Sequence, residues 1–242
     1  MLREEEYNVV VTACAPFKEN ERNPTQDVKV ELPERIEREG RIPIRVIKYP
    51  IDFRNVIADM DIIPKLWSGK KSVYEPHCKP DKKIHIDAML HMGMSFYDEW
   101  QVETRARRDG YDWVGDDGVP LPKHGGKDGR WEGLPKVLMP DFNVERTVRQ
   151  LHRERPNTPT MTSQDAGLLY CEFIFYTSLS TLYEAGKKRH VMFLHHPGDK
   201  TEKGDIEEGA KVAASVICSM IDQLEELPEM LAKRGNILWR CT

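Results

Sequence analysis

The sequence lacks long apolar runs, an excess of basic residues and internal repeats. No stretch among its 242 residues approaches the roughly 18 consecutive apolar residues of a membrane span, so we expect no membrane partner. The formal net charge of −4 argues against nucleic acid as a partner, because phosphate binding needs a surplus of Lys and Arg. Residues 1–6 are acidic and lack the apolar core of a signal peptide, which predicts a protein that is not exported.

Cysteine is scarce and widely scattered. The chain has an odd number of cysteines, five in all: Cys14, Cys78, Cys171, Cys218 and Cys241. Without a secretion signal, they predict reduced thiols in a cytoplasmic protein and not a disulfide framework. His77, Cys78 and His85 lack a recognised zinc-ligand spacing, so we expect neither a metal nor a cofactor.

Short β-branched runs alternate with segments of helical periodicity along the chain. Strands are predicted at residues 8–12, 45–49, 85–92, near 160, and at 190–195. Helices are predicted after residue 25 and over residues 53–66, 143–153, 168–183 and 205–233, with Pro228 bending the last helix or ending it early. Between residues 109 and 140, Gly, Pro and charged residues predict a long irregular loop. The alternation predicts one α/β domain over residues 1–242, a three-layer α/β/α sandwich around a largely parallel mixed sheet.

Cys171 lies close to the predicted start of a helix. Asp165 is a candidate N-cap, because its carboxylate can accept hydrogen bonds from backbone N–H groups two or three residues later. In the first or second turn, the positive end of the helix macrodipole would stabilise a Cys171 thiolate. A single cysteine on an amphipathic helix is more often an ordinary core residue, so position alone leaves both interpretations open.

His195 and His196 end an apolar strand directly before Pro197. Sites in open α/β sheets gather at the carboxyl ends of strands, so this is a favourable place for a catalytic base. Because successive strand residues point to opposite faces, at most one of the two imidazoles can face Cys171. A strand-end histidine held only by structural hydrogen bonds is the commoner case, and spacing alone selects no acidic residue to orient an imidazole.

Three segments in the first half of the chain resemble ordered motifs of one enzyme family. Residues 9–17, followed by Asn-Pro-Thr at 23–25, resemble the opening V-V-T-G-F-x-P-F…N-P-S. Residues 90–95 resemble the strand and turn V-H-V-G-V-S, and Glu103, with Tyr111 eight residues later, resembles the spacing around a catalytic glutamate. The family that these segments resemble is pyroglutamyl peptidase I, a family of cysteine peptidases.

The second half carries the two segments that bear the family's nucleophile and base. Residues 163–171 resemble the nucleophile motif S-x-D-A-G-x-Y-x-C, and residues 193–197 resemble F-x-H-x-P. The resemblance implies Cys171 as nucleophile, His195 as general base and then acid, and Glu103 as the group that orients His195. It implies hydrolysis, without a metal, of the amide after an N-terminal 5-oxoproline of a small peptide or amide, through a thioester. Backbone N–H groups at the start of the Cys171 helix are the candidate oxyanion donors. Family members occur as monomers and homotetramers, so a homo-oligomer stays open.

The positions that the resemblance assigns to substrate binding are partly altered. They are Phe17, Cys14, Met94 and Phe96. Ala13-Cys14 stands where the family has Gly-Phe, and Phe96 replaces the glycine after Ser95. A lost phenyl contact in a small pocket weakens binding by a few kcal/mol, and Phe96 could either refill that space or block it.

Two further departures concern the nucleophile motif and a pair of arginines. Leu169 takes the tyrosine position of the motif, and Tyr170 stands one residue later. Arg107 and Arg108 replace an asparagine region, where they could bind a substrate carboxylate or form a solvated charge cluster.

Three functions remain open on this sequence. The first is a pyroglutamyl peptidase. The second is a diverged relative that acts on another amide, lactam or ester by hydrolysis, acyl transfer or cyclisation, and the altered pocket residues separate it from the first. The third is a catalytically silent binding protein, against which the retained Cys, His and Glu argue.

Overall fold

Seven strands form one sheet in the part of the chain that the computed structural model describes, residues 6–16, 22–49, 56–75, 83–115, 118–121, 130–198 and 200–238. In spatial order the strands are β2 (Arg35–Ile36), β3 (Ile44–Lys48), β1 (Tyr7–Ala13), β4 (Ala88–Ser95), β9 (Val191–Pro197), β5 (Trp100–Glu103) and β8 (Thr160–Ser163). The strands β3, β1, β4 and β9 are parallel, β2 is antiparallel to β3, and the parallel pair β5 and β8 is antiparallel to β9. The sheet is therefore mixed and largely parallel, as the sequence predicts.

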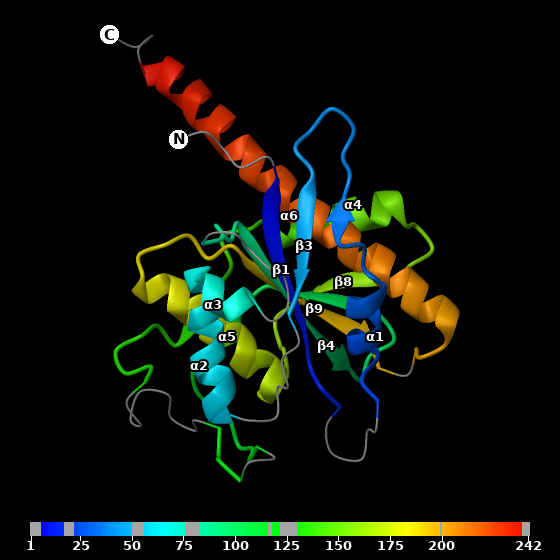
Figure 1. Cartoon of the computed structure of the whole chain (residues 1–242), viewed down its shortest axis with the longest axis vertical. Helices are drawn as coiled ribbons and strands as arrows, with labels where there is room; N and C mark the ends of the chain where they lie inside the picture. The colour runs from blue at the N-terminus through cyan, green and yellow to red at the C-terminus, as the bar shows by residue number, and fades with distance from the viewer. Residues whose placement is uncertain are drawn as a thin grey trace.

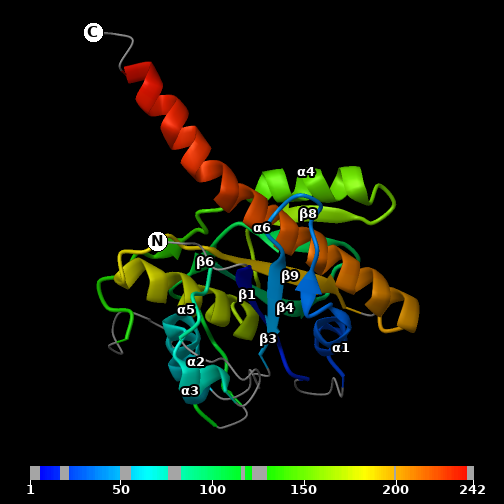
Figure 2. The same cartoon turned by 45° about the horizontal axis from the view of Figure 1, so that its top comes forward.

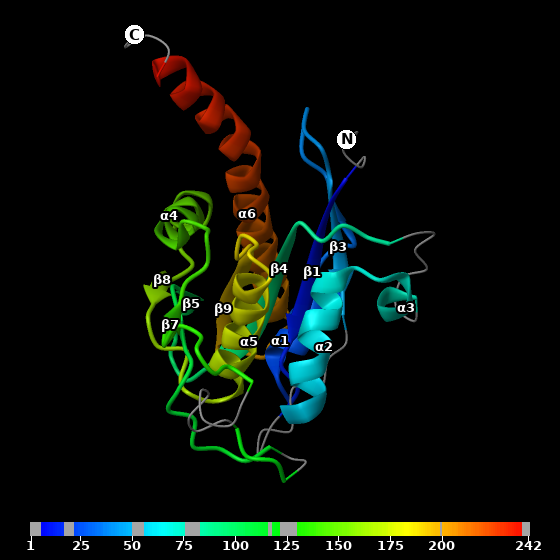
Figure 3. The same ribbon diagram turned by 90° about the vertical axis from the view of Figure 1, so that its left-hand side faces the viewer.

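Helices cover both faces of this sheet (Figure 1). One face carries α2 (Val56–Ser68), α3 (Lys71–Tyr74) and α5 (Tyr170–Glu184), and the other carries α1 (Pro24–Glu31), α4 (Val144–Glu154) and α6 (Lys203–Leu238). Figure 3, viewed from the side of α2 and α5, shows these two helices in front of the strands. The three-layer α/β/α sandwich predicted from the sequence is confirmed.

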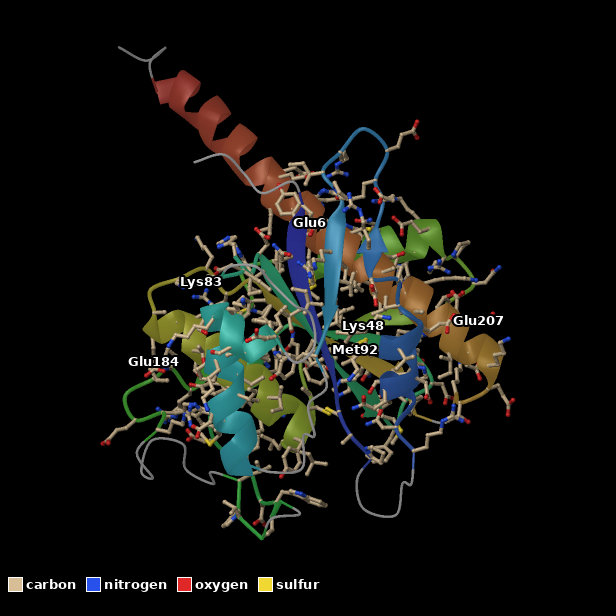
Figure 4. The ribbon with its side chains drawn as sticks, viewed as in Figure 1. Glu6, Lys48, Lys83, Met92, Glu184 and Glu207 are labelled. Atoms are coloured by element: carbon tan, nitrogen blue, oxygen red, sulfur yellow. The ribbon has the colours of Figure 1, made fainter. Side chains whose placement is uncertain are left out.

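Two apolar clusters hold the layers together, because strand residues alternate between the faces. Val10, Met89 and Phe193 pack in the cluster beneath α2 and α5. Leu90 and Met92, the latter labelled in Figure 4, pack in the cluster beneath α1, α4 and α6. The strands are therefore buried on both faces, which explains why their sequences read as continuous apolar runs.

Several element boundaries differ from those that the sequence predicts. The strand β4 continues through Gly93 to Ser95, because its ladder with β9 runs on as far as the Ser95–Pro197 pair. The helix α2 passes through Pro64, and α6 passes through Pro228 to Leu238. Figure 2 shows the C-terminal end of α6 projecting beyond the sheet. A proline removes one backbone donor, and the 36 residues of α6 retain a continuous helix despite it.

The sequence analysis missed the strand β5 entirely. Its four residues, Trp100 to Glu103, are too few to show a clear period, and their partners β9 and β8 lie far away in the sequence. A second, two-stranded sheet also went unrecognised, in which β6 (Ala106–Arg107) pairs antiparallel with β7 (Val137–Leu138).

The segment 109–140 is described except for residues 116–117 and 122–129. Its described part carries large buried side chains that pack on α5. The Tyr111 ring meets Phe173 edge-on with 6.2 Å between ring centroids, and Trp131 meets Tyr176 at 4.7 Å. Within the described residues, no helix combines the length and the apolar character needed to cross a bilayer.

Two glycines allow a test of close packing in this fold. Gly69 and Gly40 both have a positive φ, of +61° and +66°, but a Cβ on Gly69 would lie 1.9 Å from the Ile84 carbonyl oxygen, whereas Gly40 has open space around it. We expect Gly40→Ala to lower the free energy of unfolding by about 1 kcal/mol through backbone strain alone. Gly69→Ala should lower it by about 3 kcal/mol, because the overlap adds to that strain. Urea denaturation measures both, and equal losses would contradict this account.

Candidate active site

Neighbouring strands place three residues in one row at the carboxyl end of the sheet. Cys14, directly after β1, donates its backbone N–H to the Met92 carbonyl at 2.9 Å, which continues the β1–β4 ladder and sets Cys14 beside Gly93. Gly93 pairs in turn with His195 on β9. Paired residues on adjacent strands project to the same face, so the row Cys14–Gly93–His195 faces α5.

His195 and Glu103 form a buried hydrogen-bonded pair. The distance from His195 Nδ1 to Glu103 Oε1 is 2.7 Å, and the two side chains are nearly or wholly inaccessible to solvent. Glu103 reaches the imidazole because Gln101 pairs with His195 across the β5–β9 ladder, and Glu103 lies two residues further along on the same face. With Nδ1–H donating to the carboxylate, Nε2 is the ring atom available to act on Cys171.

The Cys171 sulfur lies directly over the glycine at the centre of the row. A Cβ on Gly93 would stand 2.6 Å from Cys171 Sγ, so any side chain at position 93 would displace the sulfur. Cys171 is half-buried and occupies the first turn of α5, where unpaired backbone N–H groups and the helix dipole favour an anion. The structure thus brings Cys171, His195 and Glu103 together at one end of the sheet.

The helix α5 begins later than the sequence predicts, and Asp165 is not its N-cap. The N-cap is Leu169, because Gly167 and Leu168 both have positive φ values, of 95° and 46°, and cannot continue a right-handed helix. Asp165 instead accepts a hydrogen bond from the backbone N–H of Gly167 at 3.1 Å and pairs with Arg107. The left-handed turn carries the chain into α5 so that Cys171 is the second helical residue.

An ion pair between the buried Glu172 and the partly exposed Arg107 holds this turn. Glu172, which has no solvent-exposed surface, accepts hydrogen bonds from the Leu168 backbone N–H at 2.9 Å, and from the Arg107 backbone N–H and side-chain Nε at 2.8 and 2.7 Å. Its carboxylate raises the pKa of Arg107. Arg108 is also paired within the chain, with Asp109 at 2.9 Å. Sequence reasoning missed Glu172, although an acidic residue in the first turn of a helix is a known capping signal.

Charges around Cys171 favour its thiolate. The hydrogen bond from the Cys14 thiol lowers the pKa of Cys171, and the charge and hydrogen bond of His195 add to this, whereas burial and the Glu103 carboxylate oppose it. Burial would lower the pKa of His195, but interactions with Cys171 and then Glu103 outweigh it and raise that pKa. Both shifts favour a thiolate on Cys171 paired with an imidazolium on His195.

The other buried histidines near the site are held as neutral groups. His196, on the opposite face of β9, packs edge-on against Trp100 with 4.5 Å between ring centroids, and burial lowers its pKa. His91 lies 2.7 Å from the Thr12 hydroxyl through Nδ1, and burial lowers its pKa to about 3.

A pocket of about 240 Å³ opens onto the sulfur, and its lining includes Cys14, Met94, Cys171 and His195. Phe96 also lines it, but 81% of Phe96 is exposed, so its ring stands at the rim and does not fill the space beside Cys14. Phe17 lies outside the described residues.

The pocket also contains residues that sequence reasoning missed. Gln101, only 5% exposed, brings a side-chain amide into the lining, and Tyr97 and Trp113 add aromatic surface. Gln101 belongs to the unrecognised strand β5, so its link to the site depended on long-range pairing. Across the described ranges, no group of three or more His, Cys, Asp or Glu residues is arranged to hold a metal ion.

Comparison with known proteins finds solved structures of similar fold and no sequence family. No family model matches the chain, and no curated protein matches its sequence. The chain is similar in fold to the pyrrolidone carboxyl peptidase of Thermococcus litoralis, with 18% identity and a TM-score of 0.66 over 91% of this chain and 96% of that one.

Two further solved structures are similar to this chain in fold. A mutant pyrrolidone carboxyl peptidase from Pyrococcus furiosus has 20% identity and a TM-score of 0.68 over 90% of this chain and 99% of that one. The enzyme from Thermus thermophilus has 23% identity and a TM-score of 0.59 over 88% and 98%. At these identities the similarity establishes the fold, and nearly the whole of each relative is covered.

The ionisation of Cys171 can be tested by alkylation. Iodoacetamide reacts with thiolates, so Cys171 should be labelled fastest among the cysteines and should stay reactive as the pH falls from about 8 to about 6. Cys218 is the internal control, because burial raises its pKa to about 11, and its slow labelling should increase with pH. Mass spectrometry of digested protein measures both rates. Faster labelling of Cys218 than of Cys171 would contradict the thiolate assignment.

Proposed function

We propose that this protein is a cytoplasmic cysteine peptidase that hydrolyses the amide after an N-terminal 5-oxoproline, with Cys171, His195 and Glu103 as its catalytic residues. The observation that carries the proposal is the buried hydrogen bond between Glu103 and His195, together with the Cys171 sulfur over Gly93, the strand neighbour of His195. Nucleophile, base and orienting acid are the three roles that thiol-dependent acyl transfer requires. The fold shared with pyrrolidone carboxyl peptidases supports the same substrate class.

In the proposed mechanism, the Cys171 thiolate attacks the carbonyl carbon that joins the oxoproline ring to the next residue. The oxyanion that develops accepts hydrogen bonds from backbone N–H groups in the first turn of α5. The imidazolium of His195 then donates its Nε2 proton to the departing amine, which leaves a thioester on Cys171. His195, now neutral and still held by Glu103, removes a proton from water, and the resulting attack releases the acid and regenerates the thiolate.

The pocket offers groups that suit a five-membered lactam. The Gln101 amide carries both a donor and an acceptor, which can match the ring carbonyl and the ring N–H. Met94 and Leu169 supply apolar walls for the ring methylenes. A pocket that satisfies both polar atoms of a lactam rejects an ordinary N-terminal residue, because a buried polar group would then be left unpaired.

A second candidate function follows from Cys14. Cys14 places a small thiol where the motif of the resembling family has a phenylalanine, which leaves the pocket wider. The exposed ring of Phe96 does not fill the space that this phenylalanine would occupy. This favours a diverged enzyme that keeps the three catalytic groups but accepts a larger amide, lactam or ester. The two functions differ in what fills the pocket and not in the chemistry at Cys171.

The catalytic roles are tested by release of a chromogenic amine from a pyroglutamyl amide. Cys171→Ser and His195→Ala should each lower kcat at least about a thousandfold, and the double variant should lose little more, because residues that act as a unit are not additive. Glu103→Gln should lower kcat about a hundred- to ten-thousandfold by failing to hold the imidazole tautomer. Cys218→Ser is the matched control and should retain full activity. Activity that survives loss of Cys171 would rule out the proposal.

The pocket residue Cys14 separates the two candidate functions. Cys14→Phe should raise kcat/KM on the pyroglutamyl amide about ten- to a hundredfold if missing apolar contact limits the wild-type enzyme. Cys14→Ala is the matched control, because it removes the sulfur without filling the space, and it should not raise kcat/KM. Thermal unfolding of both variants checks that the larger ring does not overpack the site. High wild-type activity that neither variant changes would show that the departure at Cys14 is neutral.

A further inference from the structure

Two side chains of the sheet, those of Cys14 and His195, flank the Cys171 sulfur. The row that faces α5 runs from Cys14 through Gly93 to His195, and the Cys171 sulfur lies over its centre. Adjacent strands are about 4.8 Å apart, so the side chains of Cys14 and His195 flank the sulfur at similar range on opposite sides. His195 supplies a base on one side, and Cys14 supplies a second thiol on the other.

The two thiols lie close together. Cys14 is the strand neighbour of Gly93, over which the Cys171 sulfur lies, and neither cysteine is in a disulfide. Both also line the 240 Å³ pocket, so a small solute that reaches one sulfur reaches the other. Cys14 is otherwise enclosed, with 5% of its surface exposed, which leaves the pocket as its route to solvent.

A buried lysine interacts electrostatically with the second thiol. Lys29, on α1, is 5% exposed and donates a hydrogen bond to the Tyr49 carbonyl at 3.3 Å. Burial lowers the pKa of Lys29 to about 8, and its attraction to Cys14 opposes that effect. A positive charge beside a sulfur favours the thiolate, which is the form that attacks an oxidised sulfur.

We propose that Cys14 and Cys171 are a peroxide-reactive dithiol, in which Cys171 is oxidised first and Cys14 closes a disulfide onto it. The reactant is hydrogen peroxide or an organic hydroperoxide small enough to enter the pocket. The inference depends on the proximity of the two sulfurs in one pocket, and does not require that the protein cleave a pyroglutamyl bond.

The chemistry proceeds in two steps. The Cys171 thiolate attacks one peroxide oxygen, the O–O bond breaks, the sulfur is oxidised to a sulfenic acid, and the departing hydroxide or alkoxide takes up a proton. Cys14 then attacks the Cys171 sulfur as a thiolate, the S–S bond forms, and the S–O bond breaks. The hydroxide released takes the proton that Cys14 gave up and leaves as water. Overall, two thiols and one peroxide give a disulfide and two molecules of water, or one of water and one of alcohol.

Such a bond would have a chemical consequence at the site. It removes the nucleophile reversibly, since a dithiol reductant restores both thiols. It also diverts Cys171 from further oxidation to sulfinic acid, which ordinary thiols do not reverse.

The test is disulfide mapping of the full-length protein after limited exposure to hydrogen peroxide. We expect non-reducing digestion and mass spectrometry to yield one cross-linked species that contains Cys14 and Cys171, with two fewer free thiols per chain, both recovered with dithiothreitol. In Cys14→Ser, the cross-link should be absent, and the sulfinic form of Cys171 should be at least about tenfold more abundant than in the wild type. Cys218→Ser is the matched control and should form the cross-link normally.

The outcomes that would overturn the proposal are equally specific. Wild-type protein in which Cys171 becomes sulfinic acid without a cross-link, stays unoxidised, or pairs with another cysteine would each refute it. Wild-type mapping decides the matter even if Cys14→Ser is unstable, and circular dichroism checks the fold of each variant. Because the readout is a mass and not an activity, a positive result stands even if the pyroglutamyl assay fails, and the reverse also holds.

Discussion

The close approach of the Cys171 sulfur to the backbone of Gly93 is the constraint on which the rest of the site depends. A sulfur can occupy that position only because residue 93 has no side chain, and a Cβ there would stand 2.6 Å away. Once the sulfur overlies the centre of the row, strand pairing decides its neighbours. His195 and Cys14 flank it because their strands lie on either side of β4. The arrangement is therefore a property of the sheet, whose register is fixed by the buried core on both of its faces.

Negative and positive groups lie next to one another across this site, so that each charged group has a partner of opposite sign. Glu103 holds the His195 imidazolium, and the imidazolium stabilises the Cys171 thiolate. The next residue along the chain, Glu172, would repel that thiolate if it were uncompensated, but its carboxylate is paired with Arg107 and the Leu168 N–H. Buried ion pairs contribute little net stability because desolvation offsets their attraction. The Glu172 carboxylate, through Arg107 and the Leu168 N–H, holds the left-handed turn that delivers Cys171 to the sheet.

Cys14 combines three effects in one residue. As a small side chain it leaves room in the pocket, and as a donor it favours the Cys171 thiolate. As a second sulfur it provides the partner for the proposed disulfide. The chemistry of acyl transfer and the sensitivity to oxidation would then have a common origin, because both rely on a stabilised thiolate at Cys171. The lining of the pocket is a separate matter, to which Cys14, Met94 and the rim residue Phe96 all contribute.

Local sequence determined most of the longer strands and helices, because apolar periodicity and β-branching act over a few residues. It predicted β1, β3, α4 and the three-layer sandwich, and strand alternation required His195 and His196 to face opposite ways. Local rules failed at Asp165, where the left-handed Gly167 and Leu168 moved the start of the helix. They also failed at β5, which is short and gains its stability from distant partners. The contacts among Cys14, Gly93, His195 and Cys171 were decided only in the tertiary structure. They depend on the register between strands that are remote in sequence, and on a helix packed across them, which no local pattern encodes.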